Sequence, residues 1–505
     1  MLLPPLFDLI ARAFPFFLRL FAITALGIAS GSAQSTKKPN ILFLFADDYC
    51  FEALHALGDR VVETPNLDRL VARGTTFTHA YNMGSWSPAV CIASRTMLVT
   101  GRSVWQAQAV HSPLDAERAA GRLWPQLLAG AGYRTYMTGK WHLPVEAART
   151  FDQTSHVRPG MPKDTPEGYS RPVDGQPDPW NPADPKFGGY WEGGKHWSEI
   201  TADDTIAFLN ASRERDQPFF IYGAFNAPHD PRQAPQDYLD RYPLGRIPLP
   251  VNALAEYPHA EAMGSGRKLR DERLAPYPRT DRSIQTQRRE YYALITHLDA
   301  QIGRVLQALE ASGQADNTWI FFTADHGLAV GQHGLMGKQN MYEHSLRVPF
   351  IVVGPGVNAD RKIDTPIYLQ DVMATTLELA GVAKPGQVYF HSVLPLLRNP
   401  RQPGAYPEIY GAYLDRQRAI LHGGFKLILY PQGRVVRLFH LPDDPHEMKD
   451  LALDPIHAPT LRRLFSRLIE QQRQLNDALD LTALYPELAP ATPASGGGNS
   501  PKPRA

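Results

Sequence analysis

Residues 41–48, ILFLFADD, pass from an unbroken apolar run directly into two adjacent aspartates, Asp47 and Asp48. The run lacks the alternation of a half-exposed strand, so it predicts a strand that is buried on both faces, as in a parallel sheet. Four further runs are predicted as buried parallel strands: residues 134–138 (RTYMT), 218–224 (PFFIYGA), 319–323 (WIFFT) and 348–353 (VPFIVV).

Helices are predicted between these strands. Residues 65–73 begin with a proline and are followed by Gly74, an arrangement typical of helix ends. Residues 291–311 carry apolar residues at helical spacing, and residues 370–380 are predicted as another helix. Strands that alternate with helices predict an α/β fold, with a layered, mixed but mainly parallel sheet flanked by helices and a small C-terminal α+β subdomain.

The composition excludes several classes of protein. A chain of 505 residues with 43% hydrophobic and 20% charged residues is neither disordered nor collagen-like nor a disulfide-stapled miniprotein. Lys and Arg number 52 and Asp and Glu 51, so the basic surplus of a nucleic-acid-binding protein is missing and no nucleic-acid partner is expected. The two cysteines, Cys50 and Cys91, cannot form a disulfide framework.

Residues 1–33 are predicted to be a cleaved signal peptide. Arg12 and Arg19 precede an apolar run over residues 20–29, and small residues follow at positions 31–33. The run is short for a membrane span, so we expect a periplasmic or secreted protein without stable membrane insertion. The long apolar region before Arg12 leaves an uncleaved anchor or a misassigned start as alternatives.

The rest of the chain is predicted to form two domains and a tail. Residues 38–385 are predicted as one large domain, and residues 386–485 as a smaller subdomain. The smaller part contains antiparallel strands at residues 418–430 and 434–441 and a helix near residues 460–479. Residues 486–505 are rich in Pro, Gly and Ser and are predicted as a disordered tail.

Two proline-rich, irregular segments, residues 158–186 and 231–282, are predicted as loops around the rim of a site. Aromatic residues lie in or just after the first of them, and they could stack on sugar rings. The alternative is that they only pack the loops. These residues are Trp180, Tyr190, Trp191 and Trp197.

Polar residues follow four of the predicted strands. They are Asp47 and Asp48; Lys140 and His142; His229; and Asp325 and His326. Ligands of open α/β sheets bind beyond the carboxyl ends of the strands, so we expect these side chains at one rim. Each group alone is also typical of a turn, a helix cap or a solvated loop. Together, the three aspartates supply the hard oxygen ligands that Ca²⁺ or Mg²⁺ prefers, although His326 would tolerate zinc.

Cys91 is predicted to lie near the start of a helix, where the helix dipole favours a thiolate. Arg95 lies four residues later and therefore shares its helical face. Two alternatives remain, namely a buried structural cysteine and a disulfide with Cys50.

These motifs resemble the type I sulfatase family of the alkaline-phosphatase-like superfamily. Residues 91–95, CIASR, followed by TGR at 100–102, are similar to the family signature. Further similar segments are residues 39–48, 64–77, 138–142 (TGKWH), 227–230 (APHD), 323–327 (TADHG), 334–352 and 438–452. The resemblance covers most of residues 38 to 480 and implies an alkaline-phosphatase-like fold.

The resemblance also implies cofactors and residue roles. Cys91 would be oxidised to Cα-formylglycine, and one divalent cation, usually Ca²⁺ with Mg²⁺ possible, would contact it. The implied cation ligands are Asp47, Asp48, Asp325 and His326, together with the modified Cys91. Arg95, Lys140 and Lys338 would stabilise the formylglycine and sulfate oxygens. His229 would protonate the departing alkoxide, and His142 would assist at the formylglycine hydroxyl.

Three positions depart from the family pattern. Ala93 stands where proline is commonest, a variant associated with radical-type maturases, so a maturase of that kind is the expected partner. His326 and His344 stand where Asn and Glu are frequent, and His344 has no account from the sequence.

The sequence therefore predicts a secreted sulfatase that hydrolyses sulfate esters of a sulfated carbohydrate, with a sulfated small molecule or glycan as its substrate partner. One alternative is a phosphodiesterase or phosphonate monoester hydrolase of the same superfamily. Another is a non-catalytic binding protein, if Cys91 stays unmodified.

Overall fold

An eight-stranded sheet forms the centre of the fold in this computed structural model, which describes residues 37–489. Its strand order is β13-β2-β12-β10-β1-β9-β5-β6. Strand β1, Asn40–Ala46, is buried along its whole length and runs parallel to both of its neighbours. The other strands are β2 Thr75–Phe77, β5 Arg134–Lys140, β6 Gln153–Arg158, β9 Phe219–Ala224, β10 Thr318–Ala324, β12 Phe350–Val353 and β13 Arg361–Ile363. The predicted α/β sheet is confirmed.

The last predicted parallel strand is antiparallel. Strand β12 pairs antiparallel with β10, and β2 pairs antiparallel with β12. A strand buried on both faces has a continuous apolar sequence whatever its direction, so the sequence pattern could not reveal this. Residues 347 and 348 belong to a separate strand, β11 Arg347–Val348, in a small sheet with β3 Ala80–Tyr81 and β14 Ile367–Tyr368.

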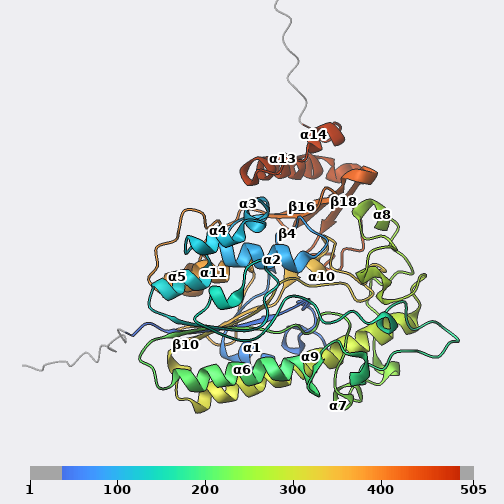
Figure 1. The fold of residues 1–505 in the computed structure, drawn as a ribbon. Coiled ribbons are helices and arrows are strands. Elements are labelled where there is room, and N and C mark those ends of the chain that lie inside the picture. Colours follow the sequence, from blue (N-terminus) through green and yellow to red (C-terminus); the bar gives the residue numbers. More distant parts are fainter. Residues whose placement is uncertain (1–36, 490–505) are drawn as a thin grey trace, which may run out of the picture. The chain divides into compact units, whose positions relative to one another are not determined.

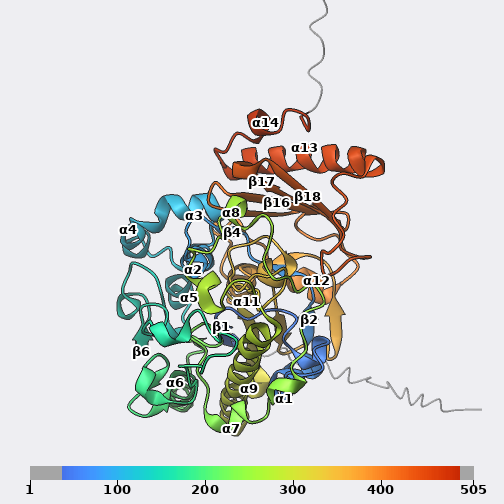
Figure 2. The same cartoon turned by 90° about the vertical axis from the view of Figure 1, so that its right-hand side faces the viewer.

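Helices cover both faces of the sheet (Figures 1 and 2). One face packs against α1 Pro65–Arg73, α6 Trp197–Ser212 and α9 Asp281–Ala311, and the other carries α2 Val90–Thr100, α5 Trp124–Gly130 and α11 Asp371–Leu379. Helix α9 begins ten residues before the predicted residue 291. Its first turn is fixed by a capping box in which the Thr280 and Ser283 side chains bond to each other's backbone N–H groups.

A second sheet has the order β18-β17-β16-β15-β4. Its strands are β4 Gly84–Ser85, β15 Ile409–Tyr413, β16 Gln417–His422, β17 Phe425–Tyr430 and β18 Val435–His440, and α13 Ala458–Leu475 packs against it. The single strand predicted over residues 418–430 is therefore a hairpin, which turns at Gly423 and Gly424 with positive φ. Strand β4 comes from the N-terminal half of the chain, so this sheet includes residues from both sides of the predicted boundary at residue 385.

Shorter elements complete the fold. They are α3 Val104–His111, α4 Leu114–Ala119, α7 Gln236–Leu239, α8 Ala260–Met263, α10 Glu343–Leu346, α12 Leu394–Arg398, α14 Leu481–Leu484, β7 Trp191–Glu192 and β8 Lys195–His196, with 3-10 turns between them. Within residues 37–489, none of the helices has the length and apolar character needed to cross a membrane. The predicted signal peptide lies outside the described residues, as does the predicted tail from residue 490 onward.

The aromatic residues in and just after the first irregular segment are buried or half-buried, so they mainly pack against neighbouring residues. Trp180 is buried and stacks on Phe187. Tyr190 is completely buried and stacks on His196, while Trp191 and Trp197 are half-buried. The suggestion that this group stacks on sugars is therefore wrong for Trp180 and Tyr190, because neither ring faces solvent.

Candidate active site

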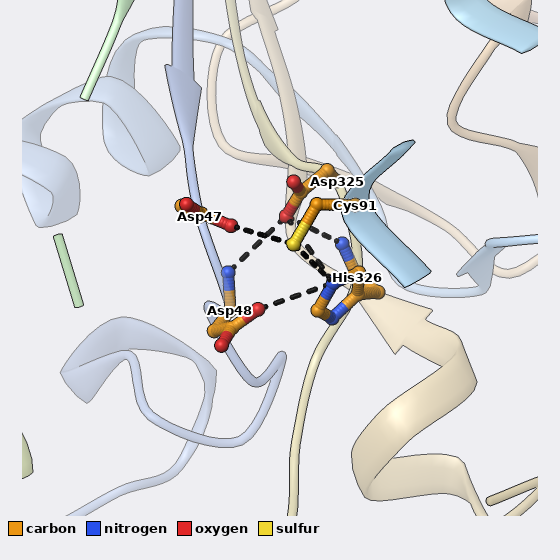
Figure 3. A group of neighbouring side chains, drawn as sticks. All are labelled: Asp47, Asp48, Cys91, Asp325 and His326. Atoms are coloured by element: carbon orange, nitrogen blue, oxygen red, sulfur yellow. Dashed lines mark hydrogen bonds and ion pairs between the residues drawn. The ribbon is translucent and has the colours of Figure 1, made fainter. Parts of the chain in front are cut away.

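The ends of parallel strands bring the predicted site residues together, as Figure 3 shows for five of them. Asp47 and Asp48 directly follow β1, and Asp325 and His326 follow the neighbouring strand β10. Lys140 is the last residue of β5. The side chains of these two aspartates, of Asp325 and His326, and of Lys140 are all buried.

Asp47, Asp48, Cys91, Asp325 and His326 each place one potential metal-ligating atom within 4.8 Å of all the others. The Nε2 atom of His326 lies 3.1 Å from Asp48 Oδ1 and 3.3 Å from the Cys91 sulfur. The Cys91 sulfur lies 3.4 Å from Asp47 Oδ1. Asp48 itself has a left-handed backbone, φ 63°, and its N–H donates to Asp325 Oδ1 at 3.2 Å. Three carboxylates, a thiol and an imidazole thus face one point. These five residues are called the metal-ligand cluster, because together they could hold a metal ion.

The electrostatics of these carboxylates fit a bound cation. Burial raises the pKa of Asp48 well above its ordinary value, against the lowering effect of Lys338. Burial also acts to raise the pKa of Asp325, but His326 and Arg95 bring it below its usual range. Burial lowers the pKa of His326 to about 4, so its ring is neutral near pH 7, as a metal ligand must be. A hard divalent cation suits this donor set because it relieves the mutual repulsion of three buried carboxylates.

Cys91 is the second residue of α2, as predicted. The predicted activation of its thiol is wrong, because burial, with a further contribution from the Asp47 carboxylate, raises the Cys91 pKa well above its ordinary value. The favourable helix dipole acts only at the first turn and is outweighed here. As a thiol, Cys91 is therefore a poor nucleophile, which agrees with a need for chemical conversion.

Helix α2 also holds the metal-ligand cluster in place. Arg95 donates from Nε to Asp325 Oδ2 at 3.1 Å and from Nη1 to the Lys140 carbonyl at 2.7 Å. Its Nη2 is buried without a hydrogen-bond partner among the described residues. Lys140 Nζ donates to Asp47. Arg95 and Lys140 are both completely buried, so they place two fixed positive charges beside the carboxylates.

Lys338 joins the cluster from a loop far along the chain. Its Nζ lies 2.9 Å from Asp48 Oδ2, 3.5 Å from the Cys91 sulfur and 2.9 Å from His229 Nε2. The His229 Nδ1 lies 2.6 Å from the Asp230 carbonyl oxygen, so Nδ1 carries the hydrogen and Nε2 accepts from Lys338. Burial and the Lys338 charge lower the His229 pKa well below its ordinary value.

A cavity of about 280 Å³ opens onto this group of residues. It is lined by Pro88, Ala89, Cys91, His142, Met161, His229, Leu269, Arg270, Asp271, Lys338 and Gln339. His142 is another lining residue, and it has a buried Nδ1 without a hydrogen-bond partner among the described residues. Burial and the Lys140 charge lower the His142 pKa to about 2. All ten predicted site residues therefore lie in the metal-ligand cluster, against it or in this cavity, while their individual roles stay predictions.

Sequence reasoning missed residues that position the site. Ser94 Oγ donates to the Asp325 carbonyl at 2.7 Å, and Asn82 donates to the same oxygen at 2.9 Å. Buried Glu272 accepts from the N–H groups of Met336 and Gly337, which shapes the loop that carries Lys338. Ser94 stands inside the CIASR motif and could have been singled out. Glu272 lies in an irregular segment without periodicity, so no sequence signal marked it.

Cys50 and His344 are two residues whose roles the sequence leaves open. Both cysteines are free thiols, so the alternative of a Cys50–Cys91 disulfide is not what the structure shows. His344 is buried in α10 and packs beside Tyr342 and His333, outside the metal-ligand cluster.

Comparison with known proteins identifies the family. Residues 39–382 match the Sulfatase family, and residues 331–474 match the family described as N-sulphoglucosamine sulphohydrolase, C-terminal. An N-acetylglucosamine-6-O-sulfatase of Bacteroides thetaiotaomicron is 26% identical over 91% of this chain and 91% of its own length. An arylsulfatase of Clostridium perfringens is 27% identical over 82% of this chain and 90% of its own length.

Solved structures share the fold. One, in complex with its substrate D-glucosamine-2-N,6-O-disulfate, has a TM-score of 0.67 and 25% identity, covering 88% of this chain and 99% of that one. The phosphonate monoester hydrolase of Agrobacterium radiobacter has a TM-score of 0.68 over 86% of this chain and 96% of that one, but at 21% identity this likeness concerns the fold alone. The chain belongs to the sulfatase family of the alkaline-phosphatase-like superfamily and is a hydrolase of sulfate esters.

Proposed function

We propose that this sulfatase is exported and removes sulfate from a sulfated carbohydrate, using a formylglycine derived from Cys91 and a divalent cation, Ca²⁺ or Mg²⁺. The observation that carries the proposal is the meeting of Cys91, in its CIASR motif, with three carboxylates and His326 in one buried cluster. The carbohydrate substrate is supported by a relative that is an N-acetylglucosamine-6-O-sulfatase. Export is supported by the sequence of residues 1–33.

The cofactors would supply the nucleophile and charge neutralisation. Converted to formylglycine, residue 91 would supply a hydrated aldehyde as the nucleophile that displaces the ester alcohol from sulfur, and loss of sulfate would restore the aldehyde. The cation, held by Asp47, Asp48, Asp325 and His326, would neutralise charge on the sulfate oxygens. The Ala93 variant of the signature supports a radical-type maturase as the partner that converts Cys91.

The chain's own cations would bind the sulfate group. Lys338 Nζ lies 3.5 Å from the Cys91 sulfur. Arg95 donates to the Asp325 carboxylate, and Lys140 donates to that of Asp47. Because these side chains are buried and held by hydrogen bonds, their charges are fixed before the substrate arrives. Fixed charges aimed at the sulfate oxygens lower the barrier for transfer.

His229 would protonate the departing alcohol oxygen. Its hydrogen-bonded Nδ1 leaves Nε2 facing Lys338 and the cavity that reaches Cys91. In the free enzyme the ring is neutral, since burial and Lys338 lower its pKa. A bound sulfate ester adds negative charge beside the ring and therefore favours the protonated form that can act as an acid.

The test compares sulfate and phosphate esters of one alcohol. With formylglycine-containing protein, kcat/KM for 4-nitrophenyl sulfate should exceed that for 4-nitrophenyl phosphate and for a phosphonate monoester. A screen of sulfated mono- and polysaccharides should then find a sugar substrate, and Cys91→Ala should abolish turnover of all of them. Higher efficiency on the phosphorus esters would contradict the proposal.

A further inference from the structure

The cavity beside Cys91 has a buried inner part and an exposed mouth. Cys91, His229, Asp271, Lys338 and Gln339 are buried, whereas Pro88 is exposed and Met161, Leu269 and Arg270 are half-buried. Met161 and Arg270 come from the two irregular segments that the sequence predicts as rim loops. At about 280 Å³ the cavity lies just below the range that takes drug-sized ligands, so it is the size for one sugar ring and its sulfate.

Arg270 is the charged residue at this mouth. Its side chain is 27% exposed, compared with 5% for Asp271 and 3% for Lys338. Its Nε donates to Asp271 Oδ1 at 2.8 Å, and its Nη2 lies 3.2 Å from Asp230 Oδ2. These two buried carboxylates hold the guanidinium in one orientation, as a planar fork allows.

One nitrogen of the fork has a weak hydrogen-bond acceptor as its partner in the protein. Arg270 Nη1 faces the thioether of Met161, which is a weak acceptor. A hydroxyl or carbonyl oxygen of a bound ring would be a stronger one. Asp230 and Asp271 offset the charge of the guanidinium. Lys338 lies 4.0 Å from Asp271 but is engaged more closely by another carboxylate, so the guanidinium favours a neutral acceptor over a second anionic group.

On these grounds we propose that Arg270 is a specificity-determining residue, which hydrogen-bonds to a neutral substituent of the single sugar ring that carries the sulfate. The ring would be a hexose or an N-acetylhexosamine with hydroxyl or acetamido groups. A ring with an N-sulfate or a uronic carboxylate at the same place would be disfavoured. The inference rests on the proposed sulfatase function.

The first test measures substrate choice. Protein with confirmed formylglycine is assayed on mono-O-sulfates of hexoses and N-acetylhexosamines, on the same rings with an added N-sulfate or uronic carboxylate, and on 4-nitrophenyl sulfate. We expect the best neutral ring to exceed its doubly anionic counterpart at least tenfold in kcat/KM. Preference for the doubly anionic ring overturns the proposal.

Two further outcomes are distinguishable. Hydrolysis of 4-nitrophenyl sulfate without hydrolysis of any monosaccharide sulfate overturns the assignment of Arg270 and leaves the sulfatase chemistry intact. Inactivity on every sulfate ester overturns the proposed function, and this inference with it.

The second test uses variants of Arg270. R270Q should lower the ratio of sugar-sulfate to aryl-sulfate kcat/KM by about tenfold, the effect of one hydrogen bond from a charged donor. R270K keeps a charge between Asp230 and Asp271 and so protects the fold, but it lacks the fork and should also lower the ratio. The matched control is R273Q, an exposed arginine three residues on, which should leave the ratio unchanged. If both Arg270 variants keep the wild-type ratio within twofold, the proposal is wrong.

Discussion

Asp325 connects the metal-ligand cluster to the helix that carries Cys91. Its side chain accepts from the backbone of Asp48 and from Arg95, while its carbonyl accepts from Ser94. One residue thus fixes a potential cation ligand, a cationic side chain and the start of α2. These shared partners connect the ends of β1 and β10 to helix α2.

Asp325→Asn should remove the cation and most of the activity. An amide lacks the negative charge that a hard cation requires, and its NH₂ group would face Arg95. We expect metal content by elemental analysis to fall well below one per chain and kcat/KM to fall at least about 10²-fold. Asp299→Asn is the control, because this buried carboxylate only accepts bonds from Asn66 and Leu67 at the start of α1. Stoichiometric metal in Asp325→Asn would show that the ligand assignment is wrong.

Tyr190 positions His229 through the backbone. Its hydroxyl lies 2.7 Å from the His229 carbonyl oxygen and 2.8 Å from that of Asn226, and the residue is completely buried. Tyr190→Phe should lower kcat/KM about fivefold to tenfold for esters of poorly leaving alcohols, through the loss of one hydrogen bond. The effect on 4-nitrophenyl sulfate should be smaller, since its leaving group needs no acid. Tyr133→Phe, which loses a bond to Pro39 outside the site, should leave the two substrates' ratio unchanged.

At the scale of elements, the irregular end of β5 places Lys140. The register of β5 against β6 shifts between Thr138 and Gly139, and Gly139 has φ 87°. A Cβ at Gly139 would lie 1.8 Å from the Ala224 carbonyl oxygen of β9, so only glycine fits there. The residue that follows is Lys140, whose position therefore depends on this close approach.

Gly139→Ala should unfold the protein or abolish its activity. The side chain would force β5 away from β9, at a cost of several kcal/mol on top of the backbone strain. Gly132→Ala is a matched control with φ 92° but with open space around its Cβ, and it should cost only about 1 kcal/mol. Thermal unfolding and activity of the two variants provide the comparison, and equal effects would contradict the steric explanation.

The sequence predicted elements whose physical signal is local. The apolar runs of β1, β9 and β10 and the strand-end aspartates were predictable because burial on both faces leaves a recognisable pattern. The direction of β12 could not be predicted, because a continuous apolar run looks the same in a parallel and in an antiparallel strand. The positions of Glu272 and Tyr190 depend on how long irregular segments fold back, which local pattern does not encode.

At the scale of the whole molecule, a buried ionic group joins the second sheet to the loop of the site. Lys426 of β17 lies 2.7 Å from Glu343 and 2.8 Å from Glu447. Glu447 also accepts from the Glu343 N–H at 2.7 Å. Glu343 begins α10, five residues after Lys338, so the second sheet helps to hold the segment that reaches the cavity.

Lys426→Met should destabilise the protein by about 3–5 kcal/mol, because it leaves buried Glu447 without its cation and Glu343 with only the longer ion pair to Arg347. Chemical denaturation should show a lower free energy of unfolding. Lys449→Met, an exposed lysine of the same region, should change it by no more than about 0.5 kcal/mol. An equal, small effect at both positions would show that the buried group contributes little.

In the proposed mechanism turnover depends on the chemical state of residue 91. Burial and a neighbouring carboxylate raise the pKa of the unmodified Cys91 thiol, so that it would be a poor nucleophile. The direct measurement is mass spectrometry of the peptide that contains residue 91, taken from protein whose turnover of a sulfate ester has been quantified. We predict that the active fraction carries the aldehyde in place of the thiol, and that activity scales with that fraction across preparations. Full turnover by protein in which Cys91 is an intact thiol would contradict this mechanism.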